Sequence, residues 1–158
     1  MLYSLSISTI ADTIHALAAM ELLRAGEDEK TLLSPLLDAE RSELLSQMIK
    51  TAFAEISLTL LPYVEDIATD NESLDLSLRT PVFAFDGIHL VLRRKIEAAV
   101  AYKVIQTYIL SAASSADFPR TDYSELVDVF AKLVADAEKA LLSALIPSFE
   151  PFVRGSSL

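Results

Sequence analysis

The clearest structural pattern in the chain lies in residues 122–142, Asp-Tyr-Ser-Glu-Leu-Val-Asp-Val-Phe-Ala-Lys-Leu-Val-Ala-Asp-Ala-Glu-Lys-Ala-Leu-Leu. Its apolar residues recur every three or four positions, which is the period of one face of an α-helix. Asp122 stands where an N-cap residue belongs, and Glu125 follows three residues later, as in a capping box. The sequence therefore predicts a helix that opens at residue 121 or 122 and is closed by Pro147.

Three further segments towards the N-terminus have the same period. The first covers residues 8–25 and has Ser8 or Thr9 as its cap, with Asp12 as the capping-box partner. The second covers residues 35–61, with proline at its first position. The third covers residues 87–113. We predict a mainly all-α fold, an antiparallel bundle of about four helices in a single domain over residues 1–146, followed by a tail over residues 147–158.

The segment between the second and third helices has a different period. Residues 73–79 read Ser-Leu-Asp-Leu-Ser-Leu-Arg and alternate polar and apolar side chains, as a strand does. A second apolar group follows at Val82, Phe83 and Phe85. The pattern favours a short β-hairpin within residues 73–86, although a loop or a strand that pairs with another chain would fit as well.

Composition excludes several kinds of functional site. The chain has 158 residues and no cysteine, which rules out disulfides, thiol nucleophiles and cysteine-ligated metals. Two histidines and three glycines leave little material for a histidine metal cluster or a glycine-rich phosphate loop. No catalytic motif is present. We therefore expect a non-enzymatic protein without a cofactor.

Hydropathy bears on the location of the protein. The mean hydropathy is high, +0.38. The longest uncharged run, residues 104–116, is shorter than the ~18 residues of a transmembrane helix. Residues 1–11 lack the basic region of a signal peptide. We expect a cytoplasmic protein without a membrane partner, whose apolar excess is buried in the fold or against other subunits.

Charge is distributed unevenly along the chain. Residues 1–80 hold 14 acidic and 5 basic side chains, whereas residues 81–158 hold 9 acidic and 8 basic ones, within a net charge of −10. An acidic chain does not bind nucleic acid through a broad basic face. The acidic half is either a solvated face that maintains solubility or a surface that pairs head-to-tail with another copy.

Two D-x-x-H pairs, Asp12 with His15 and Asp86 with His89, are the candidate metal ligands. Positions i and i+3 share one face of a helix, so each pair could offer a carboxylate and an imidazole to one ion. Both aspartates also stand at predicted helix starts, where a carboxylate caps free N–H groups. Capping is the interpretation we favour, and we predict no metal.

Two segments are candidates for protein–protein contact. The only basic run is Arg93-Arg94-Lys95, which we expect to form salt bridges with the acidic first half, within the chain or between chains. The tail carries Phe149 and Phe152, which either pack back on their own domain or dock on a neighbour.

The helix over residues 93–110, Arg-Arg-Lys-Ile-Glu-Ala-Ala-Val-Ala-Tyr-Lys-Val-Ile-Gln-Thr-Tyr-Ile-Leu, is followed by a polar break and then by residues 122–142. Together they resemble the last two helices of the small helical head–tail connector (neck adaptor) proteins of tailed phages and prophages. The resemblance covers about a third of the chain and carries no catalytic residue across. The resemblance implies that copies of this protein form a ring in the virion.

These observations favour a self-associating structural subunit, a homo-oligomer or a partner of other virion proteins. Two alternatives stay open. One is a bundle that binds a metal or small molecule, and the other is an acidic regulatory protein that binds a basic partner.

Overall fold

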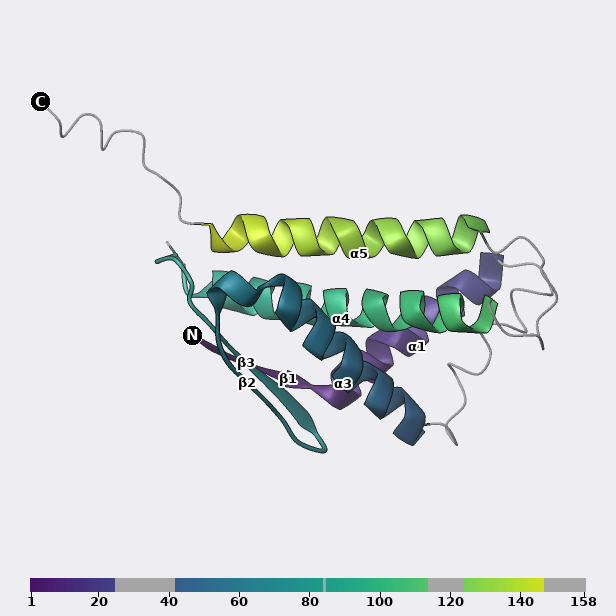
Figure 1. The fold of residues 1–158 in the computed structure, drawn as a ribbon, viewed down its shortest axis with the longest axis horizontal. Helices are drawn as coiled ribbons and strands as arrows, with labels where there is room; N and C mark the ends of the chain where they lie inside the picture. The colour runs from purple at the N-terminus through teal and green to yellow at the C-terminus, as the bar shows by residue number, and fades with distance from the viewer. Residues whose placement is uncertain (25–41, 84, 114–123, 147–158) are drawn as a thin grey trace, which may run out of the picture.

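The structure is a computed structural model that describes residues 1–24, 42–83, 85–113 and 124–146 (Figure 1). The chain opens with strand β1 (Leu2–Ser6), which leads directly into helix α1 (Ile7–Arg24). Helix α3 (Ser42–Thr59) and a 3-10 turn (Leu61–Tyr63) precede strands β2 (Val64–Thr69) and β3 (Ser73–Leu78). Helices α4 (Gly87–Ala113) and α5 (Ser124–Leu145) complete the described part.

The prediction of an all-α bundle is wrong. The described residues combine helices with a three-stranded antiparallel sheet of order β1-β3-β2. The strand period at residues 73–78 corresponds to β3, but its partners are not the predicted Val82, Phe83 and Phe85. They are β2, which precedes it in the chain, and β1, which comes from the N-terminus.

Residue pairing across the sheet follows from side-chain alternation. Tyr3 lies opposite Leu76, and Leu5 lies opposite Leu74, so these side chains share the buried face. Serines at the intervening positions of β1 occupy the other face. On the far side of β3, the pairing with β2 shifts between Val64 and Asp66, which is a β-bulge at Glu65.

Helix boundaries differ from the prediction in one instructive place. Helix α1 begins at Ile7, and its cap is Ser6, whose Oγ accepts a hydrogen bond from the Thr9 N–H at 3.3 Å. The predicted cap, Ser8 or Thr9 with Asp12, therefore lies inside the helix. The start predicted for the second helix, with its Ser34-Pro35 signal, lies outside the described residues.

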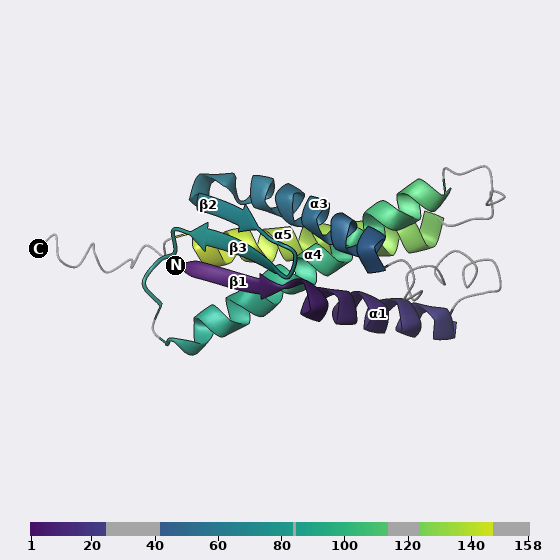
Figure 2. The same cartoon turned by 90° about the horizontal axis from the view of Figure 1, so that it is seen from below.

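Helix α4 is the centre of the helical packing. It packs against α5 on one side and against α1 and α3 on the other, and α1 and α3 also contact the sheet. Figures 1 and 2 show α5 on the side of α4 that faces away from the sheet. The core is continuous from the buried face of the sheet, through Phe53 of α3, to Phe130 of α5.

None of the described helices combines the length and the apolar character that a membrane crossing requires.

Candidate interaction surface

A groove of about 320 Å³ runs along the outer side of β1, where the first turns of α4 pass beside the strand. We call it the β1–α4 groove. Its rim is apolar, because Met1, Leu2 and Leu90 are 53%, 58% and 46% exposed. Its lining residues are Met1, Leu2, Tyr3, Ser4, His89, Leu90 and Arg93.

Tyr3 and His89 join the two walls of this groove. The Tyr3 hydroxyl and His89 Nδ1 are 2.7 Å apart, and the Phe83 ring packs edge-on against the imidazole. Burial raises the pKa of Tyr3 to about 12, so the phenol keeps its proton at neutral pH and remains a hydrogen-bond donor. This pair is a structural tie between β1 and α4.

β1 leaves one side of its backbone unpaired within the described sheet. Leu78 N–H donates to the Met1 carbonyl at 2.9 Å, and Ile7 N–H donates to the Glu72 carbonyl at 3.0 Å. In an antiparallel ladder the groups that point at the partner alternate, so the N–H and C=O of Leu2 and Ser4 point away from β3. These groups face the groove side of an edge strand that carries no charged side chain.

The opposite edge of the sheet is strand β2, which carries charged side chains, unlike β1. β2 is exposed along almost its whole length, and it carries Glu65 and Asp66. The Asp66 carboxylate accepts a hydrogen bond from the Ile67 N–H at 2.9 Å. The β-bulge, the two carboxylates and the hydrogen bond that occupies the Ile67 N–H protect the edge of β2 against pairing with another strand.

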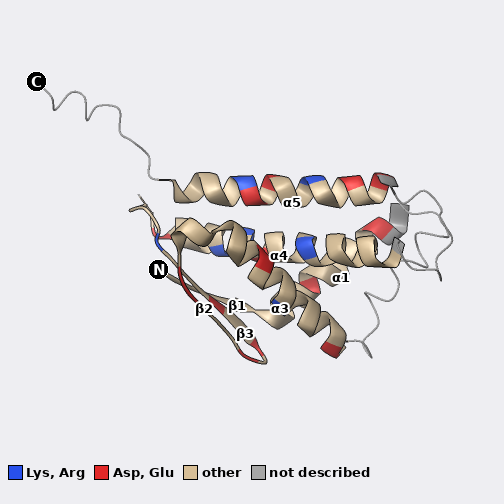
Figure 3. Cartoon of the chain, viewed as in Figure 1, with Lys and Arg blue, Asp and Glu red and all other residues tan. Residues whose placement is uncertain are grey.

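Five carboxylates gather on β2, β3 and the turn between them, and we call this feature the acidic hairpin (Figure 3). In the turn, Asp70 accepts hydrogen bonds from the N–H groups of Glu72 and Ser73, both at 2.7 Å. These bonds hold the pKa of Asp70 below its ordinary value. The five residues are Glu65, Asp66, Asp70, Glu72 and Asp75.

The basic run lies in the second turn of α4. Arg93 faces Glu97 of the same helix, with Nε and Oε1 3.8 Å apart. Burial raises the pKa of Glu97 despite that neighbour. Arg94 and Lys95 are exposed, and no ion-pair partner within 4.0 Å stands beside them in the described part of the chain. Among the described residues, Lys103 Nζ and Glu55 Oε2, 3.5 Å apart, form an ion pair between the two halves.

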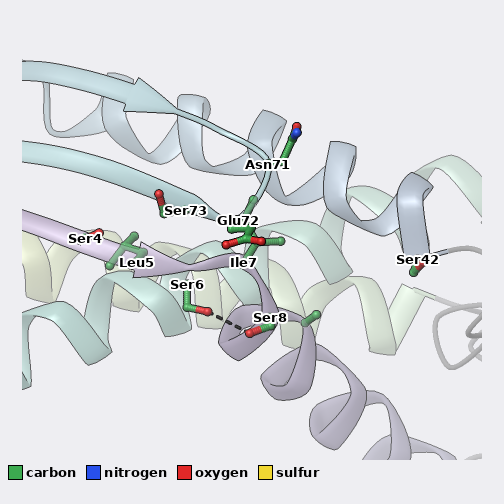
Figure 4. Close-up of a pocket in the computed structure, with 10 residues that line it drawn as sticks. Ser4, Leu5, Ser6, Ile7, Ser8, Ser42, Asn71, Glu72 and Ser73 are labelled. Carbon is green, nitrogen blue, oxygen red and sulfur yellow. Dashed lines mark hydrogen bonds between the residues drawn. The ribbon is translucent and has the colours of Figure 1, made fainter.

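A cavity of about 670 Å³ lies where the β1–α1 junction meets the β2–β3 turn and the start of α3 (Figure 4). It is rich in hydroxyl groups, several of which already bond to neighbours. Ser6 Oγ is 2.9 Å from Ser8 Oγ, and Ser4 Oγ donates to Asp75 at 2.7 Å. The polar lining residues are Ser4, Ser6, Ser8, Ser42, Asn71, Glu72 and Ser73.

The two D-x-x-H pairs take separate places in the structure. Asp12 and His15 lie on α1, and Asp12 is exposed in its second turn rather than at the helix start. Asp86 precedes α4, and its carbonyl accepts a hydrogen bond from the His89 N–H at 3.1 Å. Among the described residues, no group of three or more histidines and carboxylates could hold a metal ion.

Phe149 and Phe152 lie outside the described residues. The chain leaves α5 at Ile146, which is 54% exposed. In Figure 1 this end of α5 lies at the same end of the molecule as the N-terminus.

Comparison with known proteins identifies no relative. No protein-family model, curated protein or solved structure matches the chain.

The groove, the edge of β1 and the hydroxyl-rich cavity are features that sequence reasoning missed. A signal for β1 is nevertheless present, because Tyr3, Leu5 and Ile7 alternate with Ser4, Ser6 and Ser8.

Proposed function

We propose that this protein is a non-enzymatic structural subunit that associates with further copies of itself. The observation that carries the proposal is a concentration of exposed, large apolar side chains at one end of the molecule, which we call the apolar end. There β1 begins, α4 begins and α5 finishes (Figure 1). Its residues are Met1, Leu2, Val82, Phe85, Leu90, Val91 and Ile146.

Exposed apolar side chains scattered singly are normal on a protein surface, whereas a concentration of them marks a contact surface. Phe85 is 73% exposed, and Val82 is fully exposed. The core already includes Phe53 and Phe130, each 1% exposed, so these residues are not needed to complete it. Covering the apolar end by another copy would remove this surface from water.

The tail is a second apolar segment of the sequence, with Phe149 and Phe152 shortly after Ile146. A subunit with an apolar end and an apolar tail is suited to a ring or filament, because one surface can meet a different surface on the next copy. Assembly in the neck of a phage or prophage virion, the setting that the connector resemblance implies, is one place for such a subunit.

The test is the absolute mass in solution, measured by light scattering on a sizing column over a wide range of protein concentration. We expect the mass to rise with concentration or to reach that of a closed oligomer. Deleting residues 148–158 should weaken this association, and unchanged assembly would exclude the tail from the interface. A strict monomer at every concentration would contradict the proposal.

The acidic hairpin favours one alternative, an acidic regulatory protein. That alternative predicts a monomer that binds a basic polypeptide such as polylysine, with an affinity that falls steeply as salt is added. An oligomer with no affinity for polylysine would exclude it.

A further inference from the structure

We propose that the acidic hairpin of one copy docks against the β1–α4 groove of the next, beside Arg94. This inference rests on the proposed self-association and names its contact. Each copy would then use two different surfaces, one at each edge of its sheet. Such a head-to-tail contact builds a ring where the rotation closes and a filament where it does not.

Opposite charge is the first support. The carboxylates of the acidic hairpin have no basic side chain within ion-pair distance among the described residues. Within the described part of the chain, Arg94 beside the groove has no carboxylate within that distance. Lys50 acts on Asp70, and Arg94 acts on Glu97, only from beyond ion-pair distance. The hairpin therefore remains acidic, the Arg94 side of α4 remains basic, and the two signs are complementary.

The sheet keeps these two surfaces apart within one copy. The strand order β1-β3-β2 puts β1 at one edge and the acidic β2 at the other. Neighbouring strands are about 4.8 Å apart, so the two edges are separated by about 10 Å across β3 and face in opposite directions. The hairpin cannot fold round to reach its own groove, whereas the hairpin of a second copy can.

The two surfaces also match in their apolar parts. Ile67 is 44% exposed on β2 and directly follows the two carboxylates of that strand, Glu65 and Asp66. Leu2 and Leu90 stand exposed on the rim of the groove. Docking covers these side chains together and places Glu65 and Asp66 towards the basic turn of α4.

Pairing of like edges is less favourable. Two β2 strands would bring Glu65 and Asp66 of both copies together, and like charges placed opposite each other destabilise a strand pair. Two grooves would bring Arg93 and Arg94 of both copies together. The contact that removes both repulsions is the one between unlike surfaces.

Charge reversal tests the contact. At about 100° per residue, Arg94 lies on the same side of α4 as Leu90, and Lys95 lies on the opposite side. Arg94→Glu should weaken association about tenfold, and Lys95→Glu, the matched control, should leave it within about twofold. Glu65→Lys should weaken association like Arg94→Glu, and its control, Asp128→Lys on the far helix α5, should not.

The double variant Glu65→Lys with Arg94→Glu gives the decisive result. It should restore association, because the reversed charges again attract, while each single variant remains weak. Circular dichroism and denaturant unfolding confirm that every variant folds. Failure of the double variant to recover, with all variants folded, would overturn the contact.

Cross-linking gives an independent measurement, since the chain has no cysteine of its own. A short thiol-specific cross-linker should join Leu90→Cys copies to Ile67→Cys copies in a mixture, and neither variant to itself. Self-linking of either variant alone would instead show that like edges pair.

These experiments distinguish the contact between the acidic hairpin and the β1–α4 groove from self-association in general. A monomer under all conditions would refute both. An oligomer that tolerates Arg94→Glu and Glu65→Lys but dissociates when residues 148–158 are deleted would keep the proposed function and refute this contact.

Discussion

At the residue scale, the tie between Tyr3 and His89 is the most specific feature. Tyr3 is 2% exposed and contributes its hydroxyl to a contact across 86 positions of the chain. A buried hydroxyl that loses its partner costs more than an exposed one, because water does not replace the lost hydrogen bond. This contact therefore helps to hold β1 against α4.

Tyr3→Phe should lower the free energy of unfolding by about 1 kcal/mol, the value of one hydrogen bond. Tyr63→Phe, which changes a half-buried tyrosine with no described hydroxyl partner, is the matched control and should change it by less than about 0.5 kcal/mol. Urea unfolding at neutral pH measures both. Equal effects would show that the bond with His89 adds no stability.

The raised pKa of Tyr3 also predicts a pH dependence. The ordinary value is 10.0 and the folded value is about 12, so the folded state holds the proton more tightly than the unfolded state. Its stabilising contribution is complete below pH 10 and is lost as the pH rises to 12. The difference in stability between wild type and Tyr3→Phe should therefore shrink over that interval.

The pKa of Asp70 is shifted in the opposite direction to that of Tyr3. Its carboxylate accepts two backbone hydrogen bonds and one from the Ser73 hydroxyl, and its pKa is lowered from 3.8. Its contribution is present above pH 3.8 and is lost as the pH falls through the lower folded value. Asp70→Ala should destabilise the protein at neutral pH, and that difference should shrink in acid. Asn71→Ala, at an exposed neighbour that carries no titratable group, is the control.

At the element scale, β3 organises the sheet because it pairs with both other strands. Leu76 lies in its middle and is fully buried against the helices. Leu76→Ala should cost about 2–5 kcal/mol in the free energy of unfolding. Leu58→Ala, at a position 66% exposed on α3, should cost well under 1 kcal/mol. Similar costs at both positions would contradict a sheet packed on the core.

Helix α5 is held in the fold mainly by its packing against α4. Among the described elements its main contact is with α4, and Phe130 is its largest fully buried side chain. Phe130→Ala should therefore loosen α5 first, because local stability follows local packing. Hydrogen exchange should show faster amide exchange in residues 124–145, with β3 still protected. Equal acceleration in both would indicate one cooperative unit.

At the scale of the whole molecule, salt discriminates between two kinds of self-association. A net charge of −10 makes copies repel one another, and salt screens that repulsion. An interface held by apolar side chains alone should strengthen as NaCl rises from ~0.05 to ~0.5 M. A contact between the acidic hairpin and the basic turn of α4 should weaken over the same range, because screening removes its attraction.

Light scattering at both salt concentrations measures the direction of this change. The Arg94→Glu variant is the internal control, since its association should no longer fall as salt is added. A wild-type association that strengthens with salt would contradict the electrostatic contact.

Much of this protein could be inferred from local sequence alone. The helical period located α1, the described part of α3, α4 and α5 to within a few residues, and the alternation at residues 73–78 located β3. Each of these signals is a repeat along one segment, which reflects which face of that segment is buried.

The fold class could not be inferred in the same way. β1 pairs with β3 across about 70 intervening residues, and β2 has no alternating pattern because a bulge interrupts its register. The periodicity of one segment does not indicate which distant segment pairs with it. The pairing of β1 with β3 depends on burying Tyr3 and Leu5 together with Leu74 and Leu76. The same pairing leaves β1 open, forms the groove beside it and sets the acidic hairpin at the opposite edge of the sheet.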